Sequence, residues 1–180
     1  MLVLLGWSAS GKDSIQKILV KEYGLVNIVS YTTRPKRDYE KEEVDYHFIT
    51  AEEFKKLDSE GFFAETTSYI MAGGNKVYYG SAIKDVTDDK VAILNPEGFR
   101  QLKNCKSLNI KSFLIDCPKE ELLKRLEKRG DKEEEYTRRL AADERDFWGI
   151  ADEVDFIINN DGTSDLEKVV DVIYRNYTNQ

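Results

Sequence analysis

A strand-loop-helix pattern at the start of the chain restricts the possible folds more than any other feature. Leu2–Leu5 is a short apolar run typical of a buried strand, and apolar residues recur at helical spacing after Lys12. Between them, Gly6-Trp-Ser-Ala-Ser-Gly11-Lys12 has the spacing G-x-x-x-x-G-K of a phosphate-binding loop. In such a loop backbone N–H groups surround phosphate oxygens, and the lysine reaches the outer phosphates. We therefore expect an α/β domain that binds a nucleoside triphosphate.

Residue 13 departs from the usual form of this loop. The position after the lysine is normally Ser or Thr, whose hydroxyl helps to bind Mg²⁺, and here it is Asp13. A carboxylate can also bind Mg²⁺, so we expect Asp13 to be the metal ligand. The alternative is that Asp13 only interacts favourably with the helix dipole. The residues expected to contact the triphosphate are Gly6, Ser8, Ala9, Ser10, Gly11, Lys12, Asp13 and Ser14.

Length and composition are those of an ordinary globular protein. The 180 residues suffice for one domain, and 41% hydrophobic with 34% charged residues is usual for such a domain. A net charge of −7 argues against general nucleic-acid binding, and no apolar run is long enough to span a membrane. Cys105 and Cys117 lack metal-ligand spacing, so we expect reduced thiols in a cytoplasmic protein. His47 lies between aromatic residues, where a packing role is expected.

The rest of the chain alternates between strand and helix patterns. Strands are expected at 25–29, 46–49, 62–65, 77–80, 90–94, 111–115 and 154–158. Helices are expected at 12–23, 51–59, 97–103, 119–148 with a break at 130–131, and 165–177. The short strands within 31–90, which include a hairpin, indicate a small β-rich insertion. The remaining alternation predicts a parallel sheet with helices on both faces and ligands at the carboxyl ends of the strands.

Several later motifs resemble one enzyme family in their order and spacing. Ser30-Tyr-Thr-Thr-Arg34-Pro-Lys-Arg37, Asp45-Tyr-His-Phe48, Glu65, Tyr78-Tyr-Gly-Ser81, Arg125-Leu-Glu-Lys-Arg129-Gly130 and Arg138-Arg-Leu140 follow the loop. Together with the loop they resemble guanylate kinase, a P-loop nucleoside monophosphate kinase family, over nearly the whole chain. The resemblance implies a GMP-binding insertion at 31–90 and a helical lid at 123–148. It also implies transfer of the γ-phosphoryl group of Mg²⁺–ATP to GMP or dGMP.

The motif around Arg34 has the chemistry of a phosphate site. Arg34 and Arg37 could bind an acceptor phosphate through bidentate hydrogen bonds, with hydroxyl donors from Tyr46 and Tyr79. The alternative is a solvated arginine pair that is neutralised by Glu40 and Asp45. By resemblance, the full acceptor site consists of Ser30, Arg34, Arg37, Tyr46, Glu65, Tyr79, Ser81 and Glu97.

Glu65 carries the expected base specificity. A carboxylate can accept two N–H bonds from the Watson–Crick edge of guanine, which adenine cannot supply. By resemblance, Ser30 and Ser81 complete this base pocket. An exposed strand glutamate with no binding role is the alternative.

The charged helical region supplies the expected catalytic arginines. Phosphoryl transfer needs positive charge that arrives as the site closes. By resemblance, Arg129 and Arg139 act with Lys12 on the transferred group. The alternative is helix salt bridging, since Glu121–Arg125, Glu134–Arg138 and Glu135–Arg139 all have i, i+4 spacing.

The chain departs from the family pattern at several positions besides Asp13. Ala9 replaces a usual glycine of the loop, and Asn95 and Glu97 stand where the family has a pair of aspartates. The loop expected at 66–76 is longer than the usual hairpin. These departures leave open a kinase for another nucleotide, or a catalytically weakened module that binds nucleotides or phosphopeptides. The sequence also leaves open a monomer or a homodimer.

Overall fold

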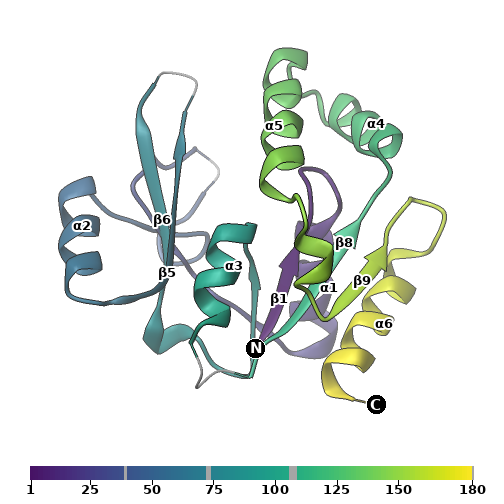
Figure 1. Ribbon diagram of the computed structural model, residues 1–180, viewed down its shortest axis with the longest axis horizontal. Coiled ribbons are helices and arrows are strands. Elements are labelled where there is room, and N and C mark those ends of the chain that lie inside the picture. The colour runs from purple at the N-terminus through teal and green to yellow at the C-terminus, as the bar shows by residue number, and fades with distance from the viewer. Residues whose placement is uncertain (39, 72–73, 106–108, 180) are drawn as a thin grey trace.

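The computed structural model describes residues 1–38, 40–71, 74–105 and 109–179. A five-stranded parallel sheet, in the order β2-β7-β1-β8-β9, forms its centre (Figure 1). Its strands are β1 (Leu2–Leu5), β2 (Val26–Asn27), β7 (Lys90–Ile93), β8 (Lys111–Asp116) and β9 (Phe156–Asn159). The predicted α/β fold is therefore confirmed. The strand expected at 25–29 is shorter in the structure: it consists of the two exposed residues of β2, at one edge of the sheet.

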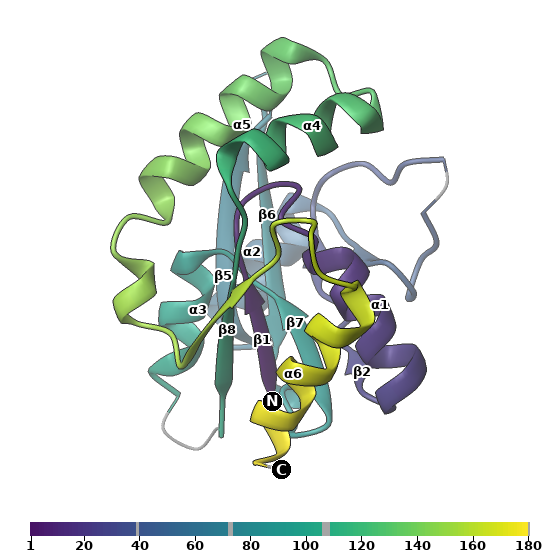
Figure 2. The ribbon, with the colours of Figure 1, turned by 90° about the vertical axis from the view of Figure 1, so that its right-hand side faces the viewer.

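Helices cover both faces of this sheet, as predicted. Helices α1 (Lys12–Tyr23) and α6 (Leu166–Thr178) pack on one face, and α3 (Pro96–Lys103) packs on the other (Figure 2). Helix α1 ends at Gly24, whose φ of 72° closes the last turn in the left-handed conformation. No helix in the described part of the chain is long and apolar enough to cross a membrane.

The central strand β1 explains why its sequence is continuously apolar. Leu2 and Leu4 enter the core shared with α1 and α6, whereas Val3 and Leu5 enter the core shared with α3. All four side chains have no exposed surface. A strand buried on both faces has no polar side, so the loop that follows β1 begins from a rigid position.

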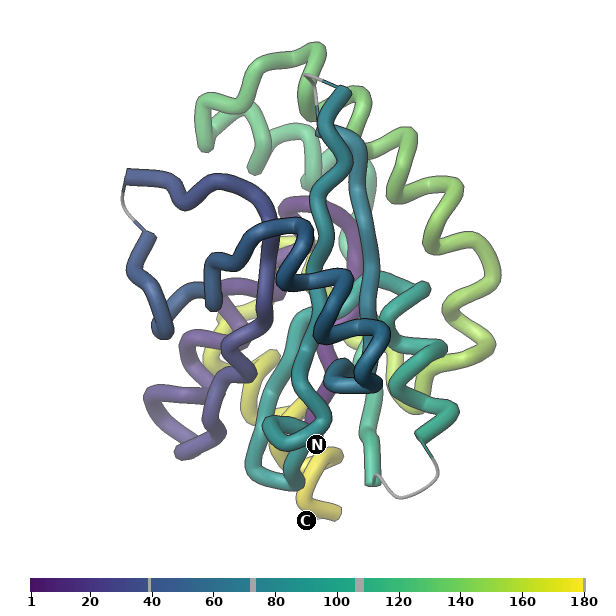
Figure 3. Tube along the Cα trace, turned by 90° about the vertical axis from the view of Figure 1, so that its left-hand side faces the viewer, coloured from purple at the N-terminus to yellow at the C-terminus, as the bar shows by residue number. Residues whose placement is uncertain are grey.

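A second, four-stranded sheet lies within the expected insertion, in the order β4-β3-β6-β5 (Figure 3). Its strands are β3 (Tyr31–Thr32), β4 (His47–Phe48), β5 (Phe63–Ile70) and β6 (Lys76–Ala82). The prediction of a loop at 66–76 is wrong for most of that range. Residues 66–70 belong to β5, because its antiparallel pairing with β6 continues to Ile70 opposite Lys76. Residues 72 and 73 of that range lie outside the described residues.

Local signals fix the remaining parts of this region. Helix α2 (Ala51–Ser59) begins with the predicted capping box, in which Thr50 accepts from the Glu53 N–H and Glu53 accepts from the Thr50 N–H. The His47 ring stacks on Tyr31 with centroids 4.4 Å apart, which agrees with the expected packing role. One short 3₁₀ helix, Ile83–Asp85, follows β6, and another, Ile150–Asp152, lies outside this region, just before β9.

Two charged helices lie over the end of β1 that carries the loop (Figure 2). Helix α4 (Lys119–Arg129) ends at Gly130 and α5 (Glu133–Asp146) follows, so the predicted break is present. Leu122 and Leu126 of α4 form a small core with α5, against which Trp7 and Ala9 of the loop also pack. This contact places the predicted lid arginines near the loop.

Candidate active site

The loop after β1 has a backbone that only glycine accommodates at two points. Gly6 has φ 149° and Gly11 has φ 102°, in a region that L side chains rarely adopt. A Cβ on Gly6 would lie 2.6 Å from the Ile115 carbonyl oxygen, and one on Gly11 would collide with Asn160. Both glycines of the motif are therefore required for the loop to curve against β8 and the segment after β9.

Ala9 also adopts a left-handed conformation, with φ 64°. This conformation costs an alanine about 1 kcal/mol relative to glycine. The family pattern has glycine here, and the structure gives the physical reason for it. The strained residue lies within the loop and packs against the core of α4 and α5.

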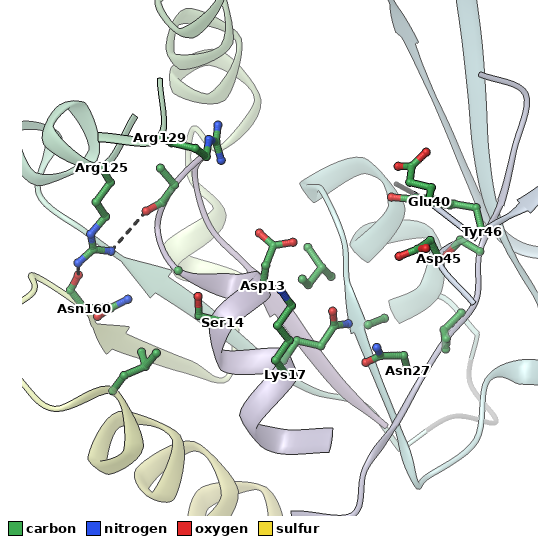
Figure 4. Close-up of a pocket in the computed structure, with 18 of the residues that line it drawn as sticks. Asp13, Ser14, Lys17, Asn27, Glu40, Asp45, Tyr46, Arg125, Arg129 and Asn160 are labelled. Atoms are coloured by element: carbon green, nitrogen blue, oxygen red, sulfur yellow. Dashed lines mark hydrogen bonds between the residues drawn. The ribbon is translucent and has the colours of Figure 1, made fainter. Parts of the chain in front are cut away.

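The carbonyl side of the loop is held by residues from distant parts of the chain. The Asn160 Nδ2 donates to the Ser10 carbonyl at 2.7 Å. Arg125 of α4 donates from Nη1 to the Ala9 and Ser10 carbonyls, and from Nη2 to the Asn160 carbonyl (Figure 4). Arg125 also forms the expected pair with Glu121. Asn160 was not predicted, since its only sequence signal is a turn after a strand.

Lys12 folds back over the loop that precedes it. Its ammonium donates to the Trp7 carbonyl at 2.7 Å and to the Ser10 hydroxyl at 3.3 Å. Burial lowers the pKa of Lys12 to about 8, although the charges of Asp13 and Asp143 oppose this shift. The ammonium is thus held at the loop by neutral oxygens in a partly desolvated position, where an anionic ligand would be favourable.

Asp13 extends from the first turn of α1 into a cavity of about 930 Å³ (Figure 4). The same cavity is lined by Ser14, Lys17, Arg129 and Asn160. Asp13 is exposed and faces the space beside the loop, so its carboxylate is accessible to a cation. Among the described residues no three His, Cys, Asp or Glu side chains converge as a metal site. Asp13 supplies one carboxylate of the kind that Mg²⁺ uses together with phosphate oxygens.

A second cavity, of about 340 Å³, connects the loop with the small sheet. Gly6, Ser8 and Lys12 line one side of it, and the other side is formed by residues of the small sheet and its neighbours: Ser30, Tyr46, Glu65, Thr67, Tyr69 and Tyr79. The structure thus brings three of the predicted donor residues and four of the predicted acceptor residues to one space. Ser81 adjoins it through hydrogen bonds described next.

Glu65 lies at the buried end of this cavity, with 5% of its surface exposed. It is opposite Ser81 in the pairing of β5 with β6, and Ser81 donates to it. The Ser81 and Ser30 hydroxyl oxygens are 3.1 Å apart. Burial raises the pKa of Glu65, and the exposed Glu97 on α3 adds to the shift. The three side chains form one polar cluster.

Arg34 is occupied by a partner within the chain. Its Nη1 donates to Glu40 at 2.7 Å and its Nε donates to the Tyr79 hydroxyl at 3.1 Å, with the guanidinium 5.1 Å from the Tyr46 ring centre. The hydrogen bond from Arg34 lowers the pKa of Glu40 to about 2. Glu40 therefore neutralises Arg34, as the alternative expected, but Arg34 is buried and not solvated.

The remaining charges of this motif are arranged differently. Arg37 donates its backbone N–H to Glu40 at 2.8 Å, while its side chain is half exposed. Asp45 accepts from the Lys41 N–H instead of an arginine. Arg37 is therefore the more accessible of the two predicted phosphate-binding arginines.

The predicted catalytic arginines both approach Asp131. Arg129 donates from Nε to Asp131 at 2.8 Å, and Arg139 lies 4.0 Å from the same carboxylate while donating to Glu135 at 2.8 Å. The expected Glu134–Arg138 pair is wrong, because Arg138 pairs with Glu135 at i, i+3. Both salt bridging and a catalytic role remain compatible with this geometry, since Arg129 also lines the larger cavity.

Comparison with known proteins identifies the family. The guanylate kinase family model matches residues 1–176. The chain belongs to the guanylate kinase family. A guanylate kinase of Nitratidesulfovibrio vulgaris is 36% identical over 149 residues, which cover 78% of this chain and 70% of that protein. One of Sulfurimonas denitrificans is 34% identical over 182 residues, with 96% of this chain and 85% of that protein covered.

A solved structure agrees with this assignment. The crystal structure of guanylate kinase from Anaplasma phagocytophilum superposes with a TM-score of 0.73 at 26% identity, covering 99% of this chain and 84% of that one. The family assignment therefore rests on both the sequence and the fold.

At one position where the guanylate kinase pattern has an aspartate, Asn95 has a structural role. Its Oδ1 accepts from the Gly98 N–H at 2.9 Å and so caps α3, and its Nδ2 donates to the Tyr69 hydroxyl at 2.8 Å. Both ends of the amide are thus engaged. Asn95 holds the start of α3 against the extended hairpin and has no oxygen directed to a metal by this arrangement.

Gly98 is a further residue of the site that was not predicted from the sequence. A Cβ at this helical position would lie 2.7 Å from a carboxylate oxygen of Glu65. Its φ is ordinary, so the glycine is required for space and not for backbone conformation. Gly98 allows the buried carboxylate to lie against the first turn of α3.

Lys12 should give a measurable pH dependence of stability. Its pKa of about 8 in the folded protein lies below the ordinary value of 10.5, so the unfolded chain binds more protons between these values. The unfolding free energy of the wild type should therefore rise with pH across this window, relative to Lys12→Met. Urea unfolding at several pH values checks this, with the exposed Lys17→Met as the control for lost charge. A difference that does not vary with pH would contradict the lowered pKa.

The effect of Gly98→Ala on the free energy of unfolding should change sign when the Glu65 side chain is removed. A helical Gly→Ala substitution usually stabilises by about 0.8–1 kcal/mol, but here the new methyl group displaces a buried carboxylate. We expect Gly98→Ala to destabilise the wild type and to stabilise Glu65→Ala, in which the collision is absent. A double-mutant cycle of urea unfolding measures this. Additive effects would mean that the two residues do not compete for space.

Proposed function

We propose that this chain is an ATP:GMP phosphotransferase that converts GMP or dGMP to the diphosphate with Mg²⁺–ATP as the donor. The single observation that carries this proposal is the cavity lined by both Lys12 and Glu65. One wall has the loop and ammonium of a phosphate site, and the other has a buried carboxylate suited to guanine. Family membership supports the same reaction.

In this proposal the acceptor nucleotide binds between the two sheets. Glu65 accepts the two guanine N–H bonds, and Ser30 and Ser81 hold its carboxylate in place. The acceptor phosphate lies near Arg37, Tyr46 and Tyr79, while Arg34 orients the Tyr79 hydroxyl through the bond already present. The region 31–90 then acts as the acceptor-binding part, and Glu97, whose charge acts on Glu65, belongs to the same acceptor site.

The donor triphosphate binds along the loop Gly6–Ser14 in this proposal. Lys12 and the arginines Arg129 and Arg139, from the lid at 123–148, stabilise the charge that develops on the transferred group. No side chain acts as a nucleophile, since the acceptor phosphate itself attacks. Mg²⁺, when bound with ATP, supplies charge neutralisation at the phosphates, and Asp13 is the residue that would hold it.

An acceptor panel tests the reaction and the base site together. We expect ADP release with GMP and dGMP but not with AMP, CMP or UMP. Glu65→Gln should lower kcat/KM for GMP by about tenfold to a hundredfold, because an amide cannot accept both N–H bonds. ATP affinity should stay unchanged.

Two results would contradict the proposed reaction, and a third would contradict the proposed base site. ADP release with another acceptor would make the chain a kinase for a different nucleotide. Nucleotide binding without ADP release from any acceptor would make it a binding module. Unchanged GMP kinetics in Glu65→Gln would remove Glu65 from the base site.

Asp13 should make ATP binding unusually dependent on metal. Without Mg²⁺, a carboxylate about 4 Å from a phosphate charge costs roughly 4 kcal/mol at an effective dielectric near 20. We expect Asp13→Ser to raise ATP affinity at low Mg²⁺ by about tenfold or more, and to change it little at high Mg²⁺. Calorimetric titration with and without Mg²⁺ measures this, with Glu22→Gln on the same helix as the control. Equal affinities of wild type and mutant in both conditions would show that Asp13 does not act at the metal site.

A further inference from the structure

Helix α5 places a carboxylate in the phosphate-binding loop. The Ser8 backbone N–H donates to Asp143 Oδ2 at 2.6 Å, across 135 residues of sequence. Asp143 lines the same cavity as Gly6, Ser8 and Lys12. In a loop of this kind the backbone N–H groups are the donors that phosphate oxygens use. A side-chain carboxylate thus occupies a donor that a phosphate would otherwise take.

Asp143 and Lys12 hold the same peptide unit from its two ends. The carbonyl oxygen of the Trp7–Ser8 peptide accepts from the Lys12 ammonium at 2.7 Å, and its N–H donates to Asp143. The charge of Asp143 also acts on Lys12. Because the lysine of such a loop reaches the outer phosphates, the carboxylate lies at the end of the loop where the terminal phosphate binds. The Asp143 carboxylate therefore accepts a hydrogen bond that a phosphate oxygen of a bound triphosphate would otherwise accept.

We propose that Asp143 regulates entry of the donor nucleotide, by occupying the Ser8 N–H in the empty protein until a triphosphate displaces it. This inference rests on the proposed function, since it concerns the same donor site. A carboxylate and a phosphate cannot share this N–H, and their like charges repel. Binding of the triphosphate is therefore coupled to release of the Asp143 side chain, which lies on the same helix, α5, as Arg139.

Because of this coupling, the Asp143 contact weakens binding of a nucleoside triphosphate more than binding of a nucleoside diphosphate. A triphosphate must displace Asp143 and loses part of its binding free energy in doing so. A diphosphate lacks the terminal phosphate and leaves the Asp143 contact in place. Removing the carboxylate should therefore improve ATP binding more than ADP binding.

Asp143→Asn and Asp143→Ala test this proposal by direct calorimetric binding of ATP and ADP. A hydrogen bond to a charged group accounts for about tenfold to a hundredfold in affinity, so we expect about tenfold tighter ATP binding and a smaller change for ADP. The matched control is Glu144→Gln, which removes the same charge from the next residue of α5. Glu144 is exposed and lies 3.9 Å from Lys119 in a surface pair. We expect it to leave both affinities unchanged.

Hydrogen exchange of the Ser8 amide tests the contact without any nucleotide. The amide should exchange slowly in the wild type and in Glu144→Gln, and at least about tenfold faster in Asp143→Ala. Equal exchange in all three proteins would overturn the proposal, as would ATP affinity that is unchanged or weakened in both Asp143 variants. If the wild type bound no ATP, the proposed function would fail, whereas the exchange rates would still decide whether Asp143 covers the loop.

Discussion

The arrangement of the site depends on the hydrogen bond between Asn160 Nδ2 and the Ser10 carbonyl. This bond is buried, spans 150 residues of sequence and fixes the carbonyl side of the loop. Arg125 donates hydrogen bonds to the carbonyls of Ala9 and Ser10 and also to the carbonyl of Asn160. A loop with two glycines and a strained alanine would otherwise lose much conformational entropy on binding phosphate. The long-range contacts instead make the loop rigid before the ligand arrives.

The sequence predicted those parts of the structure that depend on neighbouring residues. The loop Gly6–Lys12, the cap of α1 at Gly24 and the capping box of Thr50 with Glu53 all act over a few positions. The apolar run of β1 and the alternation of strands with helices were sufficient for the fold class. These features are local in sequence, so a single chain shows them directly.

What the sequence could not indicate depends on contacts between distant segments. Gly98 has no special backbone conformation, and only the presence of Glu65 beside α3 explains it. The Ser8–Asp143 contact has the same character, since nothing near Asp143 in the sequence relates it to the loop. The loop expected at 66–76 was wrong because cross-strand pairing, which depends on the partner strand, extends β5 and β6 beyond their own sequence signals.

The ion pairs of the empty protein differ in how readily a phosphate could replace the carboxylate that is paired with each arginine. Arg34 and Glu40 are both 6% exposed and joined by two hydrogen bonds, so separating them would leave a buried charge and cost several kcal/mol. Arg129 and Arg139 are half exposed or nearly so, and such pairs contribute at most about 1 kcal/mol. Phosphate oxygens can therefore replace Asp131 and Glu135 at little cost, whereas Glu40 stays with Arg34. In the proposed reaction Arg34 is a fixed positioning residue, and the arginines of α4 and α5 supply the charge that moves.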